Sequence, residues 1–204
     1  MVPSYKGYRV GAVYLLDTIV RSFGPSVIDR LGQRLGISPS IVNAATPMVI
    51  GFVLSALKRL LGQEGGEEKF NSLLKTGKEL VGSRGLEAFV GEADPSASTS
   101  LLDILTGDNS IEQVAANFAH KSGLDPQFDP HVAGKMMGMM APAVLNQISS
   151  LAQEHGLDVK GITNAIDENS DALASLGSFD AILDDKPGLL DDLKRGLSQL
   201  FGRG

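Results

Sequence analysis

The sequence predicts an all-α fold, a compact multi-helix bundle, on three observations. Apolar residues recur at helical spacing along most of the chain, and no stretch keeps the apolar-polar alternation of a half-buried strand. Capping side chains precede prolines, as in Ser38-Pro39, Asp125-Pro126 and Asp129-Pro130. A cap accepts from an unpaired N–H, and proline at the first helical position has no N–H to leave unpaired. Glycines follow several apolar runs, where left-handed helix ends are expected.

These signals place the helices along the chain in order. The expected helices span residues 9–23, 25–35, 39–61, 66–76, 99–106, 110–122, 130–155, 158–168 and 187–201. The helix at 110–122 has the additional support of a capping box, Ser110-Ile-Glu-Gln113. Shorter helical turns are expected within 83–90 and 170–183.

The chain also predicts two diverged helical repeats. Gly36-Ile-Ser-Pro39 opens one long helix and Gly123-Leu-Asp-Pro126 opens the other, and each long helix carries a proline in mid-pattern, Pro47 or Pro142. The interval from glycine to proline is eight residues longer in the second copy, which is close to two helical turns. An interior proline removes a backbone hydrogen bond, so each central helix is expected to be bent, and the two to cross near the bends. A hinge is the functional alternative.

The expected organisation follows from the repeats. Residues 1–90 form the N-terminal repeat, 91–98 a linker of small and polar residues, 99–186 the C-terminal repeat, and 187–204 an amphipathic C-terminal helix. Each repeat alone would bury little surface, so the two are expected to pack as one domain.

Composition limits the function classes. The chain has 204 residues, 43% of them hydrophobic and 21% charged, which is typical of a globular protein. It has no cysteine, which excludes disulfides, thiolate metal sites and a cysteine nucleophile. The net charge of −6 argues against a nucleic-acid partner, because phosphate binding needs a basic surface.

The charge is unevenly distributed. Residues 1–90 hold 11 Lys and Arg against 7 Asp and Glu, whereas residues 91–204 hold 7 against 17. Opposite charge favours contact between the halves, within one chain or head to tail between copies. The alternative is two solvated faces that never meet.

The sequence favours a cytoplasmic protein. The apolar stretch from Val10 to Leu16 is followed by Asp17 and by no small-residue cleavage site before Arg21, which is unlike a secretory signal. The run from Ala44 to Leu57 is short for a membrane span of roughly 20 residues and indicates a buried core helix. Integral membrane insertion is therefore not expected, although peripheral association stays open.

No pattern indicates an enzyme, a cofactor or a metal site. The chain lacks Gly-x-Ser-x-Gly, the phosphate-binding Gly-x-x-x-x-Gly-Lys-[Ser/Thr] and His-Glu-x-x-His. Asp125, Asp129 and His131 could bind a divalent ion, but both aspartates are expected to cap before prolines. Residues 167–171 lack the glycine and terminal glutamate of a calcium loop.

Two apolar clusters are candidate binding surfaces. Four methionines form a wide apolar face of the 130–155 helix, either core filling or an adaptable apolar groove: Met136, Met137, Met139 and Met140. Six large side chains share one face of the 187–201 helix, which needs a docking site on its own domain, a partner or a second copy: Leu189, Leu190, Leu193, Leu197, Leu200 and Phe201. The polar face of this helix carries acids early and bases late, as the helix dipole favours.

The glycine and proline pattern resembles the YidB-like family of bacterial domains of unknown function. The resemblance rests on Gly123-Leu-Asp, Met140-Ala-Pro and Glu154-His-Gly-Leu-Asp158, with Leu31-Gly-Gln-Arg-Leu-Gly-Ile-Ser38 and Thr46-Pro47 in the first half. It covers roughly residues 27–175, and the segment 177–185 departs from the family pattern. The resemblance implies an all-α domain and no particular activity.

These observations favour a non-catalytic interaction or assembly module that self-associates or joins a larger protein complex. Two alternatives remain: a carrier of an apolar small molecule or lipid in a Met-lined pocket, and a peripheral subunit of a membrane complex.

Overall fold

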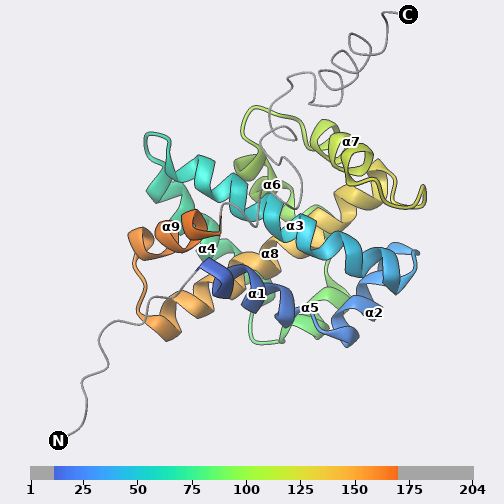
Figure 1. Cartoon of the computed structure of the whole chain (residues 1–204), viewed down its shortest axis with the longest axis horizontal. Helices are drawn as coiled ribbons and strands as arrows, with labels where there is room; N and C mark the ends of the chain where they lie inside the picture. The colour runs from blue at the N-terminus through green and yellow to red at the C-terminus, as the bar shows by residue number, and fades with distance from the viewer. Residues whose placement is uncertain (1–11, 170–204) are drawn as a thin grey trace, which may run out of the picture.

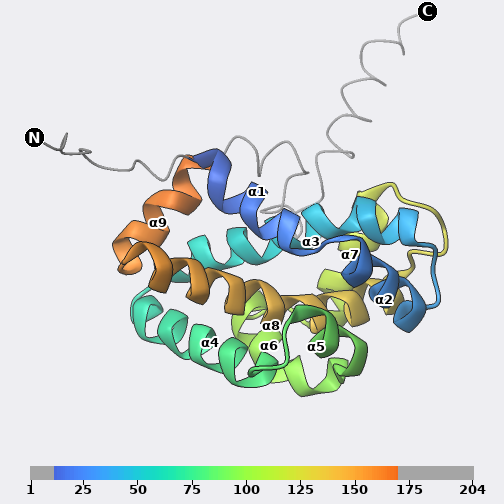
Figure 2. The same ribbon diagram turned by 90° about the horizontal axis from the view of Figure 1, so that it is seen from below.

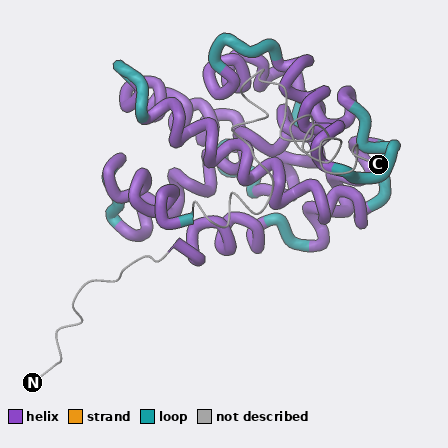
Figure 3. Tube along the Cα trace, turned by 45° about the horizontal axis from the view of Figure 1, so that its top comes forward, coloured by secondary structure: helices purple, strands orange, loops and turns teal. Residues whose placement is uncertain are grey.

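The computed structural model describes residues 12–169, and within that range every regular element is a helix (Figure 3). The elements are α1 (Ala12–Ser22), α2 (Pro25–Leu35), α3 (Pro39–Leu61), α4 (Gly66–Val81), α5 (Leu86–Glu92), the short 3-10 helix η1 (Pro95–Ser98), α6 (Thr99–Thr106), α7 (Ile111–Ser122), α8 (Pro130–His155) and α9 (Val159–Glu168). The all-α prediction is confirmed. The helix expected at 187–201 and the turns expected at 170–183 lie outside the described residues.

Three of the described helices, α3, α7 and α8, start at predicted caps. Ser38 Oγ accepts from Ile41 N at 3.4 Å, and Asp129 Oδ1 accepts from Val132 N at 2.8 Å. Both helices then begin at a proline, which suits the first helical position. Ser110 Oγ likewise accepts from Gln113 N at 3.2 Å at the start of α7.

One predicted helix start is different. Asp125-Pro126 opens a turn, and α8 begins only at Pro130. Asp125 Oδ1 accepts from Gln127 N at 2.9 Å, which is the local bond that aspartate makes in turns. The second cap and proline, Asp129-Pro130, then start the helix.

Helix α8 lies at the centre of the molecule and connects its two ends. It runs from the side of α7 to the side of α9 (Figure 2). Along this path it packs most extensively on α4 and α7, and also against η1, α3, α6 and α5. Residues 136–145 are all buried, so the middle of α8 is enclosed by other helices on every side.

Helix α3 is the second core helix and lies across the face of the bundle (Figure 1). Among the described helices it alone is long and apolar enough to cross a membrane. However, 61% of its most apolar 18-residue stretch is buried within the fold. Its apolar side chains pack against α1, α2, α4, α6, α8 and α9. This burial fits the core-helix interpretation of the Ala44–Leu57 run.

Both central helices continue past their prolines. Helix α3 runs through Pro47 and α8 runs through Pro142 without a break. Beside Pro47, the Thr46 hydroxyl is satisfied locally, because Oγ1 donates to Val42 O at 2.8 Å. The bends at the prolines and the duplication of two repeats stay predictions from the sequence.

Small residues bring backbones close to α8. A Cβ added at Gly138 would lie 2.8 Å from Pro95 O, and one added at Gly77 would lie 2.7 Å from the Cβ of Leu145. Such separations are shorter than packed atoms tolerate, so η1 and α4 reach α8 only because glycine stands at each contact. Gly138 is therefore a point of close approach between α8 and η1.

Residues from both expected repeats share one hydrophobic core. Arg34 donates to Ala93 O at 2.6 Å, and Arg59 donates to Thr106 O at 2.8 Å. Residues 91–98, expected as a linker, are the end of α5 and η1, with Ala93 and Ser98 buried. The more basic and the more acidic halves thus contact each other within one chain.

Candidate functional site

Few large apolar side chains of the described residues are exposed to solvent. Ile104 is the exposed one within residues 15–169, the range over which side-chain exposure is described, with 37% of its surface accessible. An open groove of about 430 Å³ lies where η1, α6, α7 and the first turns of α8 meet. We call it the η1 groove, and its lining residues are Pro95, Ser96, Thr99, Leu102, Ile111, Glu112, Ala115, Pro130, His131, Gly134 and Lys135.

The first wall of the η1 groove is η1 itself, held by Asp94. Asp94 Oδ1 accepts from Ser96 N at 2.9 Å and from Ser96 Oγ at 2.7 Å. These two hydrogen bonds, helped by the nearby positive charge of Arg34, hold the pKa of Asp94 below its ordinary value. Arg34 also anchors the preceding carbonyl of Ala93. The wall is therefore fixed by local bonds and by a contact from α2.

The floor of the η1 groove is built from small residues. A Cβ added at Gly134 would meet only the Cβ of Ala115, at an ordinary 3.5 Å. Leu102 and Ala115 are buried beneath this point and supply apolar surface. One turn further along α8, the backbone of Pro95 occupies the space where a side chain at Gly138 would lie. The groove thus opens at Gly134, where α7 is in ordinary contact with α8 and η1 does not reach the glycine.

The remaining walls are the starts of α7 and α8. Caps from Ser110 and Asp129 define these starts, and the rings of Phe118 and Phe128 hold the connection between the two helices. The two rings meet edge to face with their centroids 5.8 Å apart, a favourable aromatic geometry. Both walls are therefore packed against the core.

The rim of the η1 groove carries charge of both signs. Lys135 and His131 lie on α8, and Glu112 lies on α7; all three are exposed. No ion pair joins any of them to another residue in the part of the chain that the structure describes. An apolar floor with a polar rim is the usual anatomy of a protein-binding surface.

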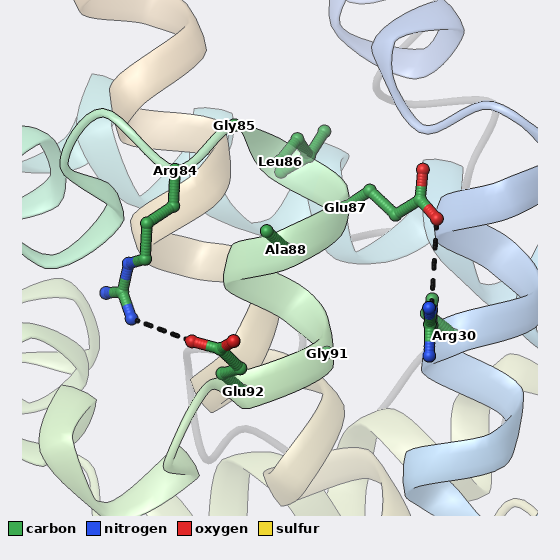
Figure 4. A pocket seen from close by; sticks show the side chains of 8 residues that line it. All are labelled: Arg30, Arg84, Gly85, Leu86, Glu87, Ala88, Gly91 and Glu92. Carbon is green, nitrogen blue, oxygen red and sulfur yellow. Dashed lines mark hydrogen bonds and ion pairs between the residues drawn. The ribbon is translucent and has the colours of Figure 1, made fainter.

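A second pocket, of about 500 Å³, lies between α2 and α5 and is polar (Figure 4). Arg84 Nη1 lies 3.4 Å from Glu92 Oε2, and Arg30 Nε lies 3.8 Å from Glu87 Oε1. These charges neutralise one another, and all four side chains are about half exposed or more. Surface pairs of this kind contribute ~0–1 kcal/mol, so the pocket offers no uncompensated charge to a ligand.

A third pocket, of about 530 Å³, lies between the end of α3 and α9. Its lining is mainly charged, and Lys58 Nζ forms an ion pair of 2.8 Å with Asp167 Oδ1 across it. Asp158, also in the lining, caps α9 by accepting from Gly161 N at 2.7 Å. Three of its five charged side chains, Lys58, Asp158 and Asp167, thus already serve in the fold.

The methionine cluster lies in the core. Met136, Met137, Met139 and Met140 are each at most 1% exposed, and none lines any of the three pockets described above. In this structure a ligand would reach them only if the surrounding helices separated. The methionines thus fill space between helices, and none of the three pockets opens onto them; the Met-lined groove stays a prediction.

The other predicted surface, from Leu189 to Phe201, lies outside the described residues. Of the residues considered for a metal, Asp129 caps α8 as predicted, whereas Asp125 caps no helix and holds the preceding turn. Within residues 12–169 no group of His, Asp and Glu is placed to hold a metal ion.

The η1 groove was not predicted from the sequence. Its floor has one local signal, the pair of glycines one turn apart on α8, Gly134 and Gly138. Such a pair indicates close approach of another backbone, but it does not show that Pro95 meets only the second glycine. That contact joins residues more than 40 positions apart and depends on the whole fold.

Comparison with known proteins gives one match. A family model described as "Bacterial protein of unknown function (DUF937)" matches residues 17–153. No curated protein and no solved structure matches the chain. The match confirms the YidB-like resemblance, because the YidB-like proteins are a DUF937 family. The chain therefore belongs to the DUF937 family of bacterial proteins of unknown function.

Proposed function

We propose that this chain is a non-catalytic interaction module that binds an amphipathic helix of a protein partner, or of a second copy, in the η1 groove. The observation that carries the proposal is the combination of an apolar floor and a charged rim whose side chains form no ion pair among the described residues. Helix-in-groove recognition uses this arrangement, with apolar anchors below and polar contacts at the edge.

The η1 groove is preformed, with a volume of about 430 Å³. The walls are fixed by helix caps and by the Gly138 contact, so the groove is formed before a partner arrives. Preformed sites bind with a smaller entropy cost than sites that must be ordered.

A pair of isoleucine variants tests the proposal. Ile111→Asp places a carboxylate in the groove, at the first position of α7, where a negative charge suits the helix dipole. Ile104→Asp makes the same change at an exposed position on α6 that does not line the groove. Both variants should fold, which circular dichroism and thermal unfolding will check.

Partner recovery and solution mass are the measurements. The tagged full-length chain is purified from its native host in separate soluble and membrane fractions, and its mass is measured by light scattering over a range of concentrations. We expect Ile111→Asp to lose the partner, or the larger assembly, that wild type and Ile104→Asp retain. The proposal is wrong if both variants behave like wild type.

A further inference from the structure

The charged residues that line the η1 groove stand on two helices. Glu112 lies on α7, and His131 and Lys135 lie on α8, whereas the wall formed by η1 and the start of α6 carries none. All three side chains are exposed, and none of them forms an ion pair within residues 12–169. The α7 side of the groove is therefore negative, and the α8 side is positive.

The floor of the groove shows that these two sides are its flanks. Helices α7 and α8 pack against each other, and a Cβ added at Gly134 of α8 would lie 3.5 Å from the Cβ of Ala115 of α7. Glu112 comes three residues before Ala115, and His131 comes three residues before Gly134. Residues three apart share a helix face, so each rim residue lies on the same face as the floor residue of its own helix. The apolar seam therefore has a negative flank and a positive flank.

The fold itself uses only one of these charges. Glu112 lies in the first turn of α7, where a negative charge suits the helix dipole. Lys135 lies in the second turn of α8, where a positive charge gains nothing from the dipole, and it has no ion-pair partner among the described residues. The two charges do not pair across the groove either. Both are therefore available to a bound molecule.

This division of charge specifies the helix that suits the groove. A helix lying on the seam places its apolar face on the floor and one flank of that face against each rim. An acidic residue suits the flank beside Lys135, and a basic residue suits the flank beside Glu112. A helix with the same sign on both flanks would meet repulsion on one side, and like charges across an interface are a common means of rejecting a wrong partner.

The described part of a second copy has no such helix to offer. Ile104 is the exposed large apolar side chain within residues 15–169. The apolar faces of the described helices are already buried in the shared core. A helix with a free apolar face must therefore come from another protein.

We propose that the partner of the η1 groove is another protein, whose amphipathic helix carries acidic residues on the flank beside α8 and basic residues on the flank beside α7. The inference rests on the proposed function, because it names the chemistry of the partner at the same groove. Turning a helix end to end exchanges its two flanks. The charges of the rim therefore select the partner and also fix the direction in which its helix lies.

Selection from a library of helices displayed on phage tests the proposal on the full-length chain. The helices have ~18 residues, enough to form a helix, with varied apolar residues on one face and Glu, Lys or Ser at the flanking positions. The targets are wild type, Glu112→Lys, Lys135→Glu/His131→Gln and the control Lys69→Glu. Lys69 is exposed on α4 and lines none of the pockets described above. All the changed side chains are exposed, so the variants should fold, which circular dichroism will check.

The flanks of the selected helices give the readout. Wild type and Lys69→Glu should enrich helices with acids on one flank and bases on the other. Glu112→Lys makes both rims basic and should enrich acids on both flanks, whereas Lys135→Glu/His131→Gln makes both rims acidic and should enrich bases on both.

Binding of purified peptides, measured by fluorescence anisotropy, should follow the same order. Wild type should bind the opposite-flank peptide about fivefold more tightly than a peptide with the same apolar face and like charges on both flanks. High salt should remove this preference, because exposed charges are screened.

Three results would overturn the proposal. The first is enrichment of the same flanks by all four targets. The second is a selection that yields no helix bound more tightly by wild type than by Ile111→Asp. The third is a dimer of wild type, seen by light scattering to grow with concentration and lost in Ile111→Asp, because the occupant would then be a second copy.

This proposal and the proposed function fail separately. Helices that bind wild type but not Ile111→Asp, whatever the charge of their flanks, would remove the charge selection and leave the groove as an interaction site. Enrichment of opposite flanks, with recovery of the native partner unchanged in Ile111→Asp, would overturn the proposed function, while the selectivity of the groove for charged flanks would stand.

Discussion

The middle of α8 and its first two turns differ sharply, although they belong to one helix. Residues 136–145 are buried without interruption, whereas His131 and Lys135 are exposed and Gly134 is half-buried beside the η1 groove. Two glycines one turn apart illustrate the difference. Gly138 admits the backbone of Pro95, and Gly134 has only the Cβ of Ala115 nearby. The same residue type therefore closes the core at one turn and leaves a groove at the previous one.

Removing a side chain from the enclosed middle should give the largest effect. Met140 is fully buried, and Met140→Ala should destabilise the fold by ~2–5 kcal/mol, since it leaves a cavity in a packed core. Lys135→Ala, at the exposed end, should change the free energy of unfolding by less than ~0.5 kcal/mol. Denaturant unfolding measures both, and similar values for the two variants would contradict the contrast.

The two glycines should respond to alanine in opposite directions. Gly138→Ala places a Cβ 2.8 Å from Pro95 O and should destabilise by ~1–3 kcal/mol, because η1 must move. Gly134→Ala meets no such contact and should stabilise by up to ~1 kcal/mol through helix propensity. Thermal unfolding of the pair checks the prediction, which fails if Gly138→Ala is the more stable variant.

The methionine face should behave as core and show no ligand effect. Met137→Leu and Met140→Leu nearly conserve volume at buried positions, so each should cost less than ~1.5 kcal/mol. Native mass spectrometry of the wild-type chain supplies the ligand readout. A bound apolar mass that these substitutions remove would favour the carrier alternative.

The smallest effect should come from Asp94 and should depend on pH. Its pKa is lowered in the folded chain, so its stabilisation is complete above the ordinary Asp value of ~3.9 and is lost as pH falls through the lower folded value. Asp94→Asn keeps a capping oxygen without the titration. Wild type should therefore lose slightly more stability than Asp94→Asn as the solution is acidified below pH ~4. Parallel losses in the two proteins would show that the Asp94 charge contributes nothing.

Helix starts could be predicted from the sequence because their signals are local. Asp129 caps α8 and Ser110 caps α7, each by accepting from the backbone N–H three residues later in the chain. Such bonds depend only on neighbouring residues. The predicted end at residue 76 was wrong for the opposite reason. Gly77 resembles a helix end, but α4 continues to Val81, because this glycine serves the close approach to Leu145 of α8.

The candidate site could not be predicted in the same way. The sequence indicated apolar surface at the methionines, but periodicity alone does not distinguish a buried face from an open one, and these side chains are enclosed. The η1 groove exists because Pro95 contacts Gly138 and does not contact Gly134. Which of the two glycines it contacts is a property of the assembled fold.

Hydrogen exchange of the full-length chain tests the η1 groove as a docking site most directly. We would compare the chain alone with the chain bound to the partner recovered from its native host, or assembled with a second copy. The expected result is slower amide exchange on binding in η1, at the start of α7 and in the first two turns of α8, with no change in residues 136–145. Unchanged exchange at the groove, or a change confined to α3 and α9, would contradict the account.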